Sequence, residues 1–407
     1  MTRSVHRVSE FDVGAVRSHI PALASGVAFF DGPGGSQVPD VVADAIRDAL
    51  TSPIANRGMV TEAERNADAI VAGARAAMAD LLGADAGGVV FGRSMTQLTY
   101  DFARTLARSW REGDEVVVSR MDHDANVRPW VQAAAAAGAV IRWADFDPAT
   151  GELTVDDVGA QLSERTRLVA ITGASNLIGT RPPVAKIAEA VHGADALFYV
   201  DGVHLTAHAP IDVAAIGADF FVCSPYKFLG PHCGVLAASP RLLEGLSFEN
   251  LLPQTDAVPE RFELGTLPYE LMAGTAAAVD FLASLGAGER RRARLTTAMI
   301  AIEAHEDGLR AEIEEGLSRL PSVVLHSRAR ERTPTLLVTF DGRAAGDAYA
   351  FLAERGVNAP AGSFYALEAS RRLGLGDDGG LRIGLAPYMN VDDVERLLAG
   401  LSAFLEH

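Results

Sequence analysis

The sequence predicts an α/β protein: a large domain whose mostly parallel sheet is sandwiched by helices, then a small C-terminal α+β domain. Short apolar runs alternate with helical segments over the first part of the chain. After Gly265 a long helical tract replaces this alternation, and shorter strands and helices follow it. The 407 residues, 48% of them hydrophobic, suffice for two such cores and exclude a disordered or fibrous chain.

The elements of the large domain follow from the spacing of apolar residues. Residues 41–50 and 62–82 repeat apolar side chains at helical spacing. VVFGRSMTQ is expected to be a buried strand turning into a helix, and EVVVSRMDHDAN a strand followed by a polar loop. Residues 131–140, with five consecutive alanines, are expected to form a helix closed by Gly138. Further strands are expected at IRWADF, RLVAITG, LFYVDG and FFVCSPY.

The C-terminal part begins with a helical tract from about residue 270 to 317, interrupted near 286–288. The strands SVVLHSR, TPTLLVTF and GGLRIGLA and helices at 345–355 and 391–405 are expected beyond it. The domain boundary is placed inside the tract. We therefore expect an N-terminal segment (1–20) that packs with the small domain, a large domain (21–275) and a small domain (276–407).

Composition excludes several classes of function. A formal net charge of −17 argues against nucleic acid and anionic membranes as partners. No apolar stretch approaches the ~18 residues that span a membrane, and the N-terminal segment has charges where a signal peptide needs its apolar centre. The only cysteines, Cys223 and Cys233, form neither a disulfide framework nor a CxxC metal pair. A cytoplasmic protein without a metal site is expected.

The motifs of nucleotide-binding proteins and hydrolases are also absent or in the wrong structural context. GLGDDG, at residues 374–379, satisfies GxGxxG, but it precedes a strand instead of joining a strand to a helix, so we interpret it as a turn. GxxxxGK, GxSxG and HExxH do not occur. An NAD-dependent dehydrogenase, which needs a glycine fingerprint between strand and helix, is therefore disfavoured.

Two features point to cofactor chemistry. Of the 36 basic residues only Lys186 and Lys227 are lysine, so each is a candidate for chemistry that needs an amine. Lys227, Asp201 and His123 each follow an apolar strand, and the carboxyl ends of parallel strands meet in one crevice. A desolvated lysine attacks an aldehyde, and an aspartate keeps a pyridinium nitrogen protonated. These are the contributions that proteins make to pyridoxal phosphate (PLP) chemistry, whereas Lys186 is interpreted as a surface residue.

Four segments carry a resemblance to a known family: MDHDANVRPW, SNLIGTRPPV, YVDGVHLTAHAPIDV and GADFFVCSPYKFLGPHCGVL. With them the chain, from FFDGPGGSQVP to the C-terminal helix, resembles the class V aminotransferases of the fold-type I PLP enzymes, and among these the cysteine desulfurase-like group. The resemblance implies that Lys227 forms the aldimine and shuttles protons at the substrate Cα. It also implies that Asp201 pairs with the pyridine nitrogen and that His123 stacks on the ring.

The resemblance extends to the cofactor's oxygen atoms. It implies that Asn176 donates a hydrogen bond to the phenolic oxygen, and that His204 lies near this oxygen, where desulfurases usually carry glutamine and an imidazole can still donate. Met95 and Thr96, at the start of a helix, would contact the phosphate. Ser224 would bind the phosphate as well, and so would Tyr226, which replaces the histidine of many relatives.

Two further contacts are implied. Gly265 and Thr266 match a loop that reaches the phosphate of the partner subunit, which implies a homodimer. Arg382 matches the arginine that holds the substrate carboxylate, a task suited to its two-pronged guanidinium.

The sequence departs from the desulfurases at one functional position. These enzymes need a cysteine on a mobile loop of the small domain, and here the matching loop, APAGSFYALEAS, carries Tyr365 instead. No cysteine follows Cys233, and Cys223 and Cys233 are interpreted as small buried residues. Sulfur transfer through a protein persulfide is therefore in doubt.

The leading hypothesis is a PLP-dependent enzyme acting on a small amino acid. β-Elimination, transamination, racemisation and desulfuration share its first steps, and the sequence names neither the reaction nor the amino acid. The alternative is a non-catalytic or degenerate PLP-binding or partner protein, against which the intact set of Lys227, Asp201, His123 and Arg382 speaks.

Overall fold

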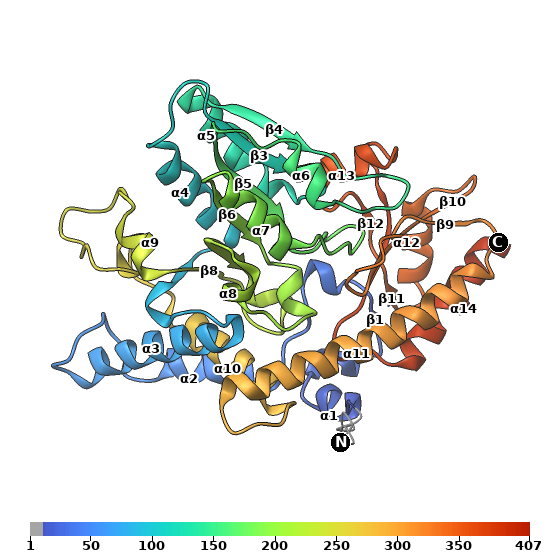
Figure 1. Cartoon of the computed structure of the whole chain (residues 1–407). Helices are drawn as coiled ribbons and strands as arrows, with labels where there is room; N and C mark the ends of the chain where they lie inside the picture. Colours follow the sequence, from blue (N-terminus) through green and yellow to red (C-terminus); the bar gives the residue numbers. More distant parts are fainter. Residues whose placement is uncertain (1–10) are drawn as a thin grey trace, which may run out of the picture.

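A seven-stranded sheet forms the centre of the large domain in the computed structural model, which describes residues 11–407 (Figure 1). The strand order is β2-β8-β7-β6-β5-β3-β4, and all neighbours are parallel except those of β8. The predicted α/β class with a mostly parallel sheet is confirmed. The strands are β2 (Val89–Gly92), β3 (Glu115–Ser119), β4 (Val140–Ala144), β5 (Thr166–Thr172), β6 (Leu197–Asp201), β7 (Phe220–Cys223) and β8 (Gly234–Ala238).

Helices cover both faces of this sheet because its strands are apolar on both sides. Along β3, Val117 belongs to one core, while Val116 and Val118 belong to the other, as the alternation of side chains in a strand requires. The second core lies under α4 (Met95–Ala107) and α5 (Arg128–Ala137). Helices that contribute to the first core are α3 (Glu62–Leu82), α7 (Val184–Gly193), α8 (Val213–Ile216) and α10 (Tyr269–Ser284), and α2 (Asp40–Thr51) packs on α10.

Two details of the predicted secondary structure are wrong. The helix expected over residues 131–140 spans Arg128–Ala137: Gly138 closes it as expected, in a left-handed conformation (φ 72°), but Val140 already opens β4. β8 was not expected, because its short run of small residues directly follows the lysine-bearing loop and carries no alternating pattern of its own.

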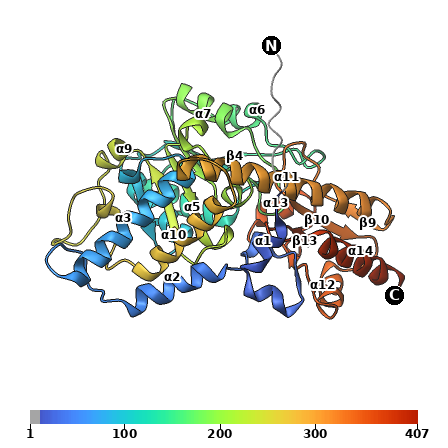
Figure 2. The same cartoon turned by 90° about the horizontal axis from the view of Figure 1, so that it is seen from below.

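The second unit is a four-stranded antiparallel sheet in the order β12-β13-β10-β9 (Figure 1). Its strands are β9 (Val323–Leu325), β10 (Thr335–Phe340), β12 (Ala361–Gly362) and β13 (Gly380–Gly384). α12 (Ala345–Ala353), α13 (Leu367–Arg372) and α14 (Val391–Glu406) complete it. The long helix α11 (Arg291–Ser318) contacts α3 and α10 at one end and α14 at the other, and so joins the two units (Figure 2).

The chain's first described residues lie with the small unit. Arg17, in α1 (Val13–Ser18), donates to the carbonyl of Tyr388 and pairs with Asp393 at 2.9 Å. Strand β1 (Ala28–Phe29) pairs with β11 (Val357–Asn358). Of the N-terminal segment predicted over residues 1–20, residues 1–10 lie outside the described part. The boundary predicted between 275 and 276 falls within α10. None of the helices in residues 11–407 is both long and apolar enough to cross a membrane.

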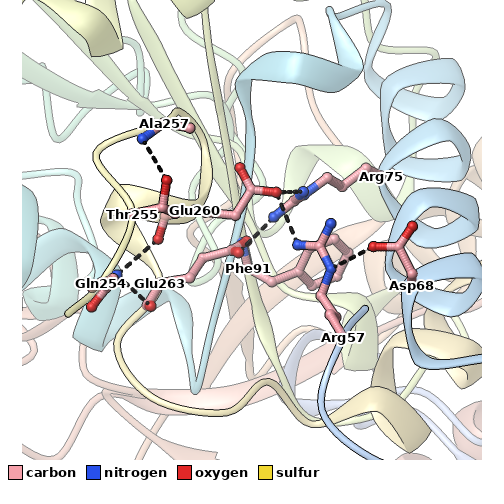
Figure 3. Close-up of polar contacts among 9 residues, drawn as sticks. All are labelled: Arg57, Asp68, Arg75, Phe91, Gln254, Thr255, Ala257, Glu260 and Glu263. Carbon is pink, nitrogen blue, oxygen red and sulfur yellow. Dashed lines mark hydrogen bonds and ion pairs between the residues drawn. The ribbon is translucent and has the colours of Figure 1, made fainter. Parts of the chain in front are cut away.

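A partly buried ion-pair cluster fixes the loop that runs from residue 254 to 266 (Figure 3). Arg75, on α3, contacts Glu263 and Glu260 at 2.6 Å each. The side chain of Arg75 is 9% exposed, and the side chain of Glu263 is 3% exposed. Glu263 also accepts a hydrogen bond from the backbone N–H of Phe91 in β2, at 2.9 Å. Arg57 extends the cluster to Glu260 at 2.9 Å. The loop carrying the predicted Thr266 is thereby held against α3 and the sheet.

We expect Arg75→Met to lower the free energy of unfolding by about 3–5 kcal/mol, because it leaves the carboxylate of Glu263 buried without its partner. Urea denaturation followed by circular dichroism measures this change. The control is Arg319→Met, which removes an exposed partner of Glu315 on the surface of α11 and should leave the transition unchanged. An unchanged midpoint for Arg75→Met would contradict the assignment of the cluster as a stabilising contact.

Candidate active site

A cavity of about 620 Å³ opens at the carboxyl ends of the parallel strands. Its walls come from the loops after β3, β5, β6 and β7 and from the small unit, which is the usual place for a ligand in an open α/β sheet. All but three of the site residues predicted from the sequence line it, namely Met95, Thr96, His123, Asn176, Asp201, His204, Tyr226, Lys227 and Arg382.

Asp201 is the last residue of β6 and is buried beneath the cavity. One of its oxygens, Oδ1, accepts a hydrogen bond from the backbone N–H of Val203 at 2.9 Å. Gly202 is required next to it, because a Cβ there would lie 1.9 Å from the ring of Phe221. Burial raises the pKa of Asp201 to about 6, against the opposing effects of the Val203 N–H and of Lys227. The carboxyl group is therefore poised to hold a positively charged ligand nitrogen.

Lys227 ends a short helical turn, Pro225–Lys227, that follows β7. Its Nζ donates a hydrogen bond to the carbonyl of Pro33 and lies 4.8 Å from the ring centre of Tyr226. Burial lowers the pKa of Lys227 from 10.5 to about 7, and the charge of Arg382 adds to the effect, while Asp201 opposes it. A large fraction of the amine is therefore uncharged at neutral pH, which is the state that attacks an aldehyde.

His123 caps the turn after β3. Its Nδ1 accepts a hydrogen bond from the N–H of Ala125 at 3.0 Å, so the proton of the neutral ring lies on Nε2. Burial, together with the nearby Lys227, lowers the pKa of His123 to about 4. The ring stacks on Tyr365 with centroids 5.4 Å apart. A neutral, flat ring at this wall can cover the face of a planar ligand.

Asp122, which the sequence did not single out, lies fully buried behind His123. It contacts Ser119, accepts a hydrogen bond from Asn126 at 2.7 Å, and lies near enough to Asp201 for the two charges to repel each other. Burial raises its pKa to about 8. Asp122 is thus a neutral carboxylic acid at pH 7. The only feature of the sequence that could have pointed to it as a site residue was its place beside His123 at a strand end.

The start of α4 offers hydrogen-bond donors to an anion. The first N–H groups of a helix have no partner within it, and Thr96 lies in this first turn after the capping Ser94. Gly234 lets β8 pass this turn, because a Cβ there would lie 2.4 Å from the backbone nitrogen of Met95. Ser224, the residue after β7, is buried, and its Oγ has no hydrogen-bond partner among the described residues. These groups could bind a phosphate.

Ser224, Gly265 and Thr266 are the three predicted residues that do not line the cavity. Thr266 lines a second cavity of about 480 Å³, together with Arg93, Gln97 and His232. This second cavity also borders the start of α4, since Gln97 belongs to that helix.

Arg382, on β13 of the small unit, is buried at the opposite wall. Its Nη1 donates to the carbonyl of Asn176 at 3.0 Å, and its guanidinium lies 3.6 Å from the ring centre of Phe364. Its Nε has no hydrogen-bond partner among residues 11–407. Burial lowers the pKa of Arg382 to about 9, and Asp31 opposes this, so the group stays charged at pH 7. A buried guanidinium with unused donors is a site for a carboxylate.

The segment Phe364–Tyr365 of the small unit lines the cavity. Both residues have a left-handed backbone, with φ of 52° and 59°, a conformation that costs non-glycine residues about 1–3 kcal/mol. Two hydrogen bonds hold it: Asn176 Nδ2 donates to the Phe364 carbonyl at 3.0 Å, and the Asp124 N–H donates to the Tyr365 carbonyl at 2.7 Å. The contact of Phe364 with Arg382 was not foreseen from the sequence.

The residues present fit PLP. A neutral amine can form the covalent link, a buried carboxyl group faces the place of a ring nitrogen, and the first turn of α4 with an unpartnered Ser224 Oγ suits a phosphate. The amide Nδ2 of Asn176 has a second hydrogen to donate beyond the one that it gives to Phe364.

Comparisons with known proteins identify the family of the chain. The family model described as aminotransferase class-V matches residues 28–397. The chain is 31% identical to the aminotransferase-like protein FGM3 of Gibberella zeae, with 98% of this chain and 99% of that protein covered. It is 31% identical to a probable cysteine desulfurase of Pseudomonas aeruginosa, with 96% and 98% covered.

A solved structure gives the same result. The cysteine desulfurase CsdA of Escherichia coli superimposes with a TM-score of 0.85 at 26% sequence identity, over 97% of this chain and 99% of that one. The predicted family resemblance is thereby confirmed. The chain belongs to the class V aminotransferase family of PLP-dependent enzymes, in which its relatives include cysteine desulfurases.

Proposed function

We propose that this protein binds PLP through Lys227 and acts at the α-carbon of a small amino acid. The observation that carries the proposal is the convergence of Lys227, Asp201 and Arg382 on one cavity. PLP, when bound, supplies an electrophilic aldehyde and a ring that withdraws electrons from the substrate's α-carbon. The residues of the chain decide how the substrate is held and where its protons go.

Each residue then has a distinct task. Arg382 binds the substrate carboxylate with its unused donors and fixes the orientation of the α-carbon. Lys227, released from the covalent link, takes up and returns the proton at that carbon, which its lowered pKa permits near neutral pH. Asp201 keeps the ring nitrogen protonated. His123 covers the ring, and Asp124 and Asn176 hold the Phe364–Tyr365 segment across the opening, which limits the access of water.

A homodimer belongs to this proposal. Thr266, on its exposed loop, would contact the phosphate bound by the partner subunit. The apolar side chains of Leu252 and Leu264 on the segment 246–266 are exposed, as is Val60 at the turn before α3. Arg57, in that turn, pairs with Glu260 of the same segment, and we propose that a second copy covers these exposed apolar groups. A reducing compartment such as the cytoplasm is proposed as its location, supported by two free cysteines.

Among the reactions of the family, we propose β-elimination over desulfuration. Cys223 and Cys233 are both buried, and burial raises the pKa of Cys223 well above its usual value and that of Cys233 to about 11. A thiol of this kind is a poor nucleophile. Tyr365 stands in the loop where desulfurases carry their cysteine, and it cannot accept sulfur.

We expect the purified protein, given L-cysteine, to release sulfide and pyruvate in equal amounts and to form little alanine or protein-bound sulfur. An amino-acid panel that follows sulfide, pyruvate and alanine tests this, with a Cys223→Ser, Cys233→Ser double variant as the control, which should behave as the parent does. Alanine formation that disappears in the double variant would restore the desulfurase function. Failure to turn over any amino acid would favour a degenerate PLP-binding protein.

We expect Arg382→Ala to raise the KM for the amino acid about 10- to 150-fold, because a charge-assisted contact with a carboxylate contributes about 1.5–3 kcal/mol. Steady-state kinetics measures the change. Arg332→Ala serves as the control, since Arg332 lies beside Glu314 and Ser327 and does not line the cavity. An unchanged KM in the Arg382 variant would show that the small domain does not bind the carboxylate.

A further inference from the structure

His204 joins the cavity to the small unit. It follows β6 in the large domain and lines the cavity, yet its Nε2 lies 2.9 Å from the hydroxyl of Thr333 and 3.1 Å from that of Thr335, at the start of β10. All three side chains are buried. Such contacts cannot be exchanged for water, so their hydrogen-bonding pattern determines which nitrogen of the imidazole carries the proton.

The pattern is set by Thr333. Its hydroxyl lies 3.2 Å from the carbonyl oxygen of Gly179 and donates its single hydrogen there, since a carbonyl only accepts. Towards His204 the Thr333 oxygen can therefore only accept, so the hydrogen between them belongs to Nε2 of His204. Thr335 provides a second oxygen near the same hydrogen.

The other nitrogen of His204 is then a free acceptor. Burial disfavours a charged ring, and the pKa of His204 is well below its usual value, with His208, Lys227 and Arg382 adding to the effect. The neighbouring His208 lies edge-on at 4.8 Å and is itself paired with Glu306 at 2.8 Å. A neutral imidazole with its proton on Nε2 has a lone pair on Nδ1, and Nδ1 has no hydrogen-bond partner in the described part of the chain.

We propose that His204 presents an unprotonated Nδ1 to the cavity and accepts a hydrogen bond there from a ligand hydroxyl, with Thr333 as the positioning residue that fixes this tautomer. The proposal rests on the proposed function, in which the ligand is PLP and the group is its ring hydroxyl. A glutamine at this position could turn its amide to donate, whereas His204 cannot. This role is the opposite of the donor role that the sequence led us to expect for His204. Asn176 would be the donor in the cavity, and His204 the acceptor.

The tautomer can be measured without the cofactor. We expect the ¹⁵N NMR shifts of His204, assigned by comparison with the His204→Gln variant, to report a neutral ring protonated on Nε2 between about pH 6 and 8. In Thr333→Val this preference should weaken, because the Thr335 hydroxyl can then donate to Nε2. A charged His204, or one protonated on Nδ1 in the parent protein, would overturn the proposal.

The holoenzyme gives an independent test through its absorbance. An acceptor beside the ring hydroxyl favours its protonated form, so His204→Gln and Thr333→Val should both raise the ratio of visible to near-ultraviolet cofactor absorbance by about 2- to 10-fold, as expected of one hydrogen bond. Thr333→Ser, which keeps the hydroxyl, should match the parent. Thr339→Val should also match the parent. It removes a similar contact, between Thr339 on β10 and His326 (2.9 Å), and neither of these residues lines the cavity.

The failure of this proposal differs from the failure of the proposed function. Borohydride reduction and mass spectrometry show whether PLP is attached to Lys227 in each variant. Attachment with identical spectra in the parent, His204→Gln and Thr333→Val would overturn the role of His204. Attachment to no residue would overturn the proposed function, and the NMR measurement would still decide the tautomer of His204.

Discussion

Replacing Lys227 with alanine should abolish covalent attachment of PLP and all detectable turnover, while the protein keeps its fold. Only an amine forms the covalent link, and the partly buried Lys227 is the lysine that lines the cavity. The anion site at the start of α4 and the carboxyl group of Asp201 do not depend on this side chain, so some PLP should still bind without a covalent bond. Borohydride reduction followed by peptide mapping measures attachment, and thermal unfolding by circular dichroism measures the fold.

The control is the other lysine of the chain. Lys186 lies in the first turn of α7 and outside the cavity, so Lys186→Ala should attach PLP and turn over substrate as the parent does. A pyridoxyl group found on Lys186 would refute the site.

The lowered pKa of Lys227 adds a pH dependence to the same prediction. Below a pKa of about 7 the amine is mostly charged and cannot attack an aldehyde, and above it the uncharged form dominates. The rate at which the PLP-free protein captures PLP should therefore rise through pH 7 and level off. A rate that rises only near pH 10 would show that the lysine is not desolvated in the cavity.

The sequence predicted the layered fold and much of the cavity for a simple physical reason. The large sheet is buried on both faces, so its strands are continuous apolar runs, and the polar residues that end them must converge on one edge of the sheet. Asp201, Lys227 and His123 were placed together on this basis alone, and all three line the cavity. Asn176 and Arg382 line it too, but they were identified by the family resemblance and not by spacing.

Contacts between distant segments could not be predicted in this way. The guanidinium of Arg382 packs on Phe364, and His204 meets Thr333, which lies 129 positions further along the chain. Neither contact leaves a local signal in the sequence, because each depends on how the small unit packs against the large one. The same holds for the ion pair between Arg75 and Glu263, which joins α3 to a loop 188 positions away.

The second large effect is expected at Asp201. In Asp201→Asn the carboxylate that holds the proton on the ring nitrogen is lost, so the ring no longer withdraws electrons from the substrate effectively. We expect kcat to fall about 10²–10³-fold, the loss that follows removal of one preorganised electrostatic contact from an active site. PLP should remain attached to Lys227, so mass spectrometry after borohydride reduction should match that of the parent while the turnover of the amino acid collapses.

Asp122 provides the matched control, because it is a second buried carboxyl group beside the same cavity. Burial keeps its pKa at about 8, so it is already neutral at pH 7, and asparagine preserves both its shape and its charge. Asp201, with a pKa of about 6, is mostly ionised at pH 7, and a cationic ring nitrogen next to it would lower that pKa further. Asp122→Asn should therefore keep most of the activity. Equal losses in the two variants would mean that the buried carboxyl groups act only in folding, and undiminished activity in Asp201→Asn would mean that the ring nitrogen needs no carboxylate.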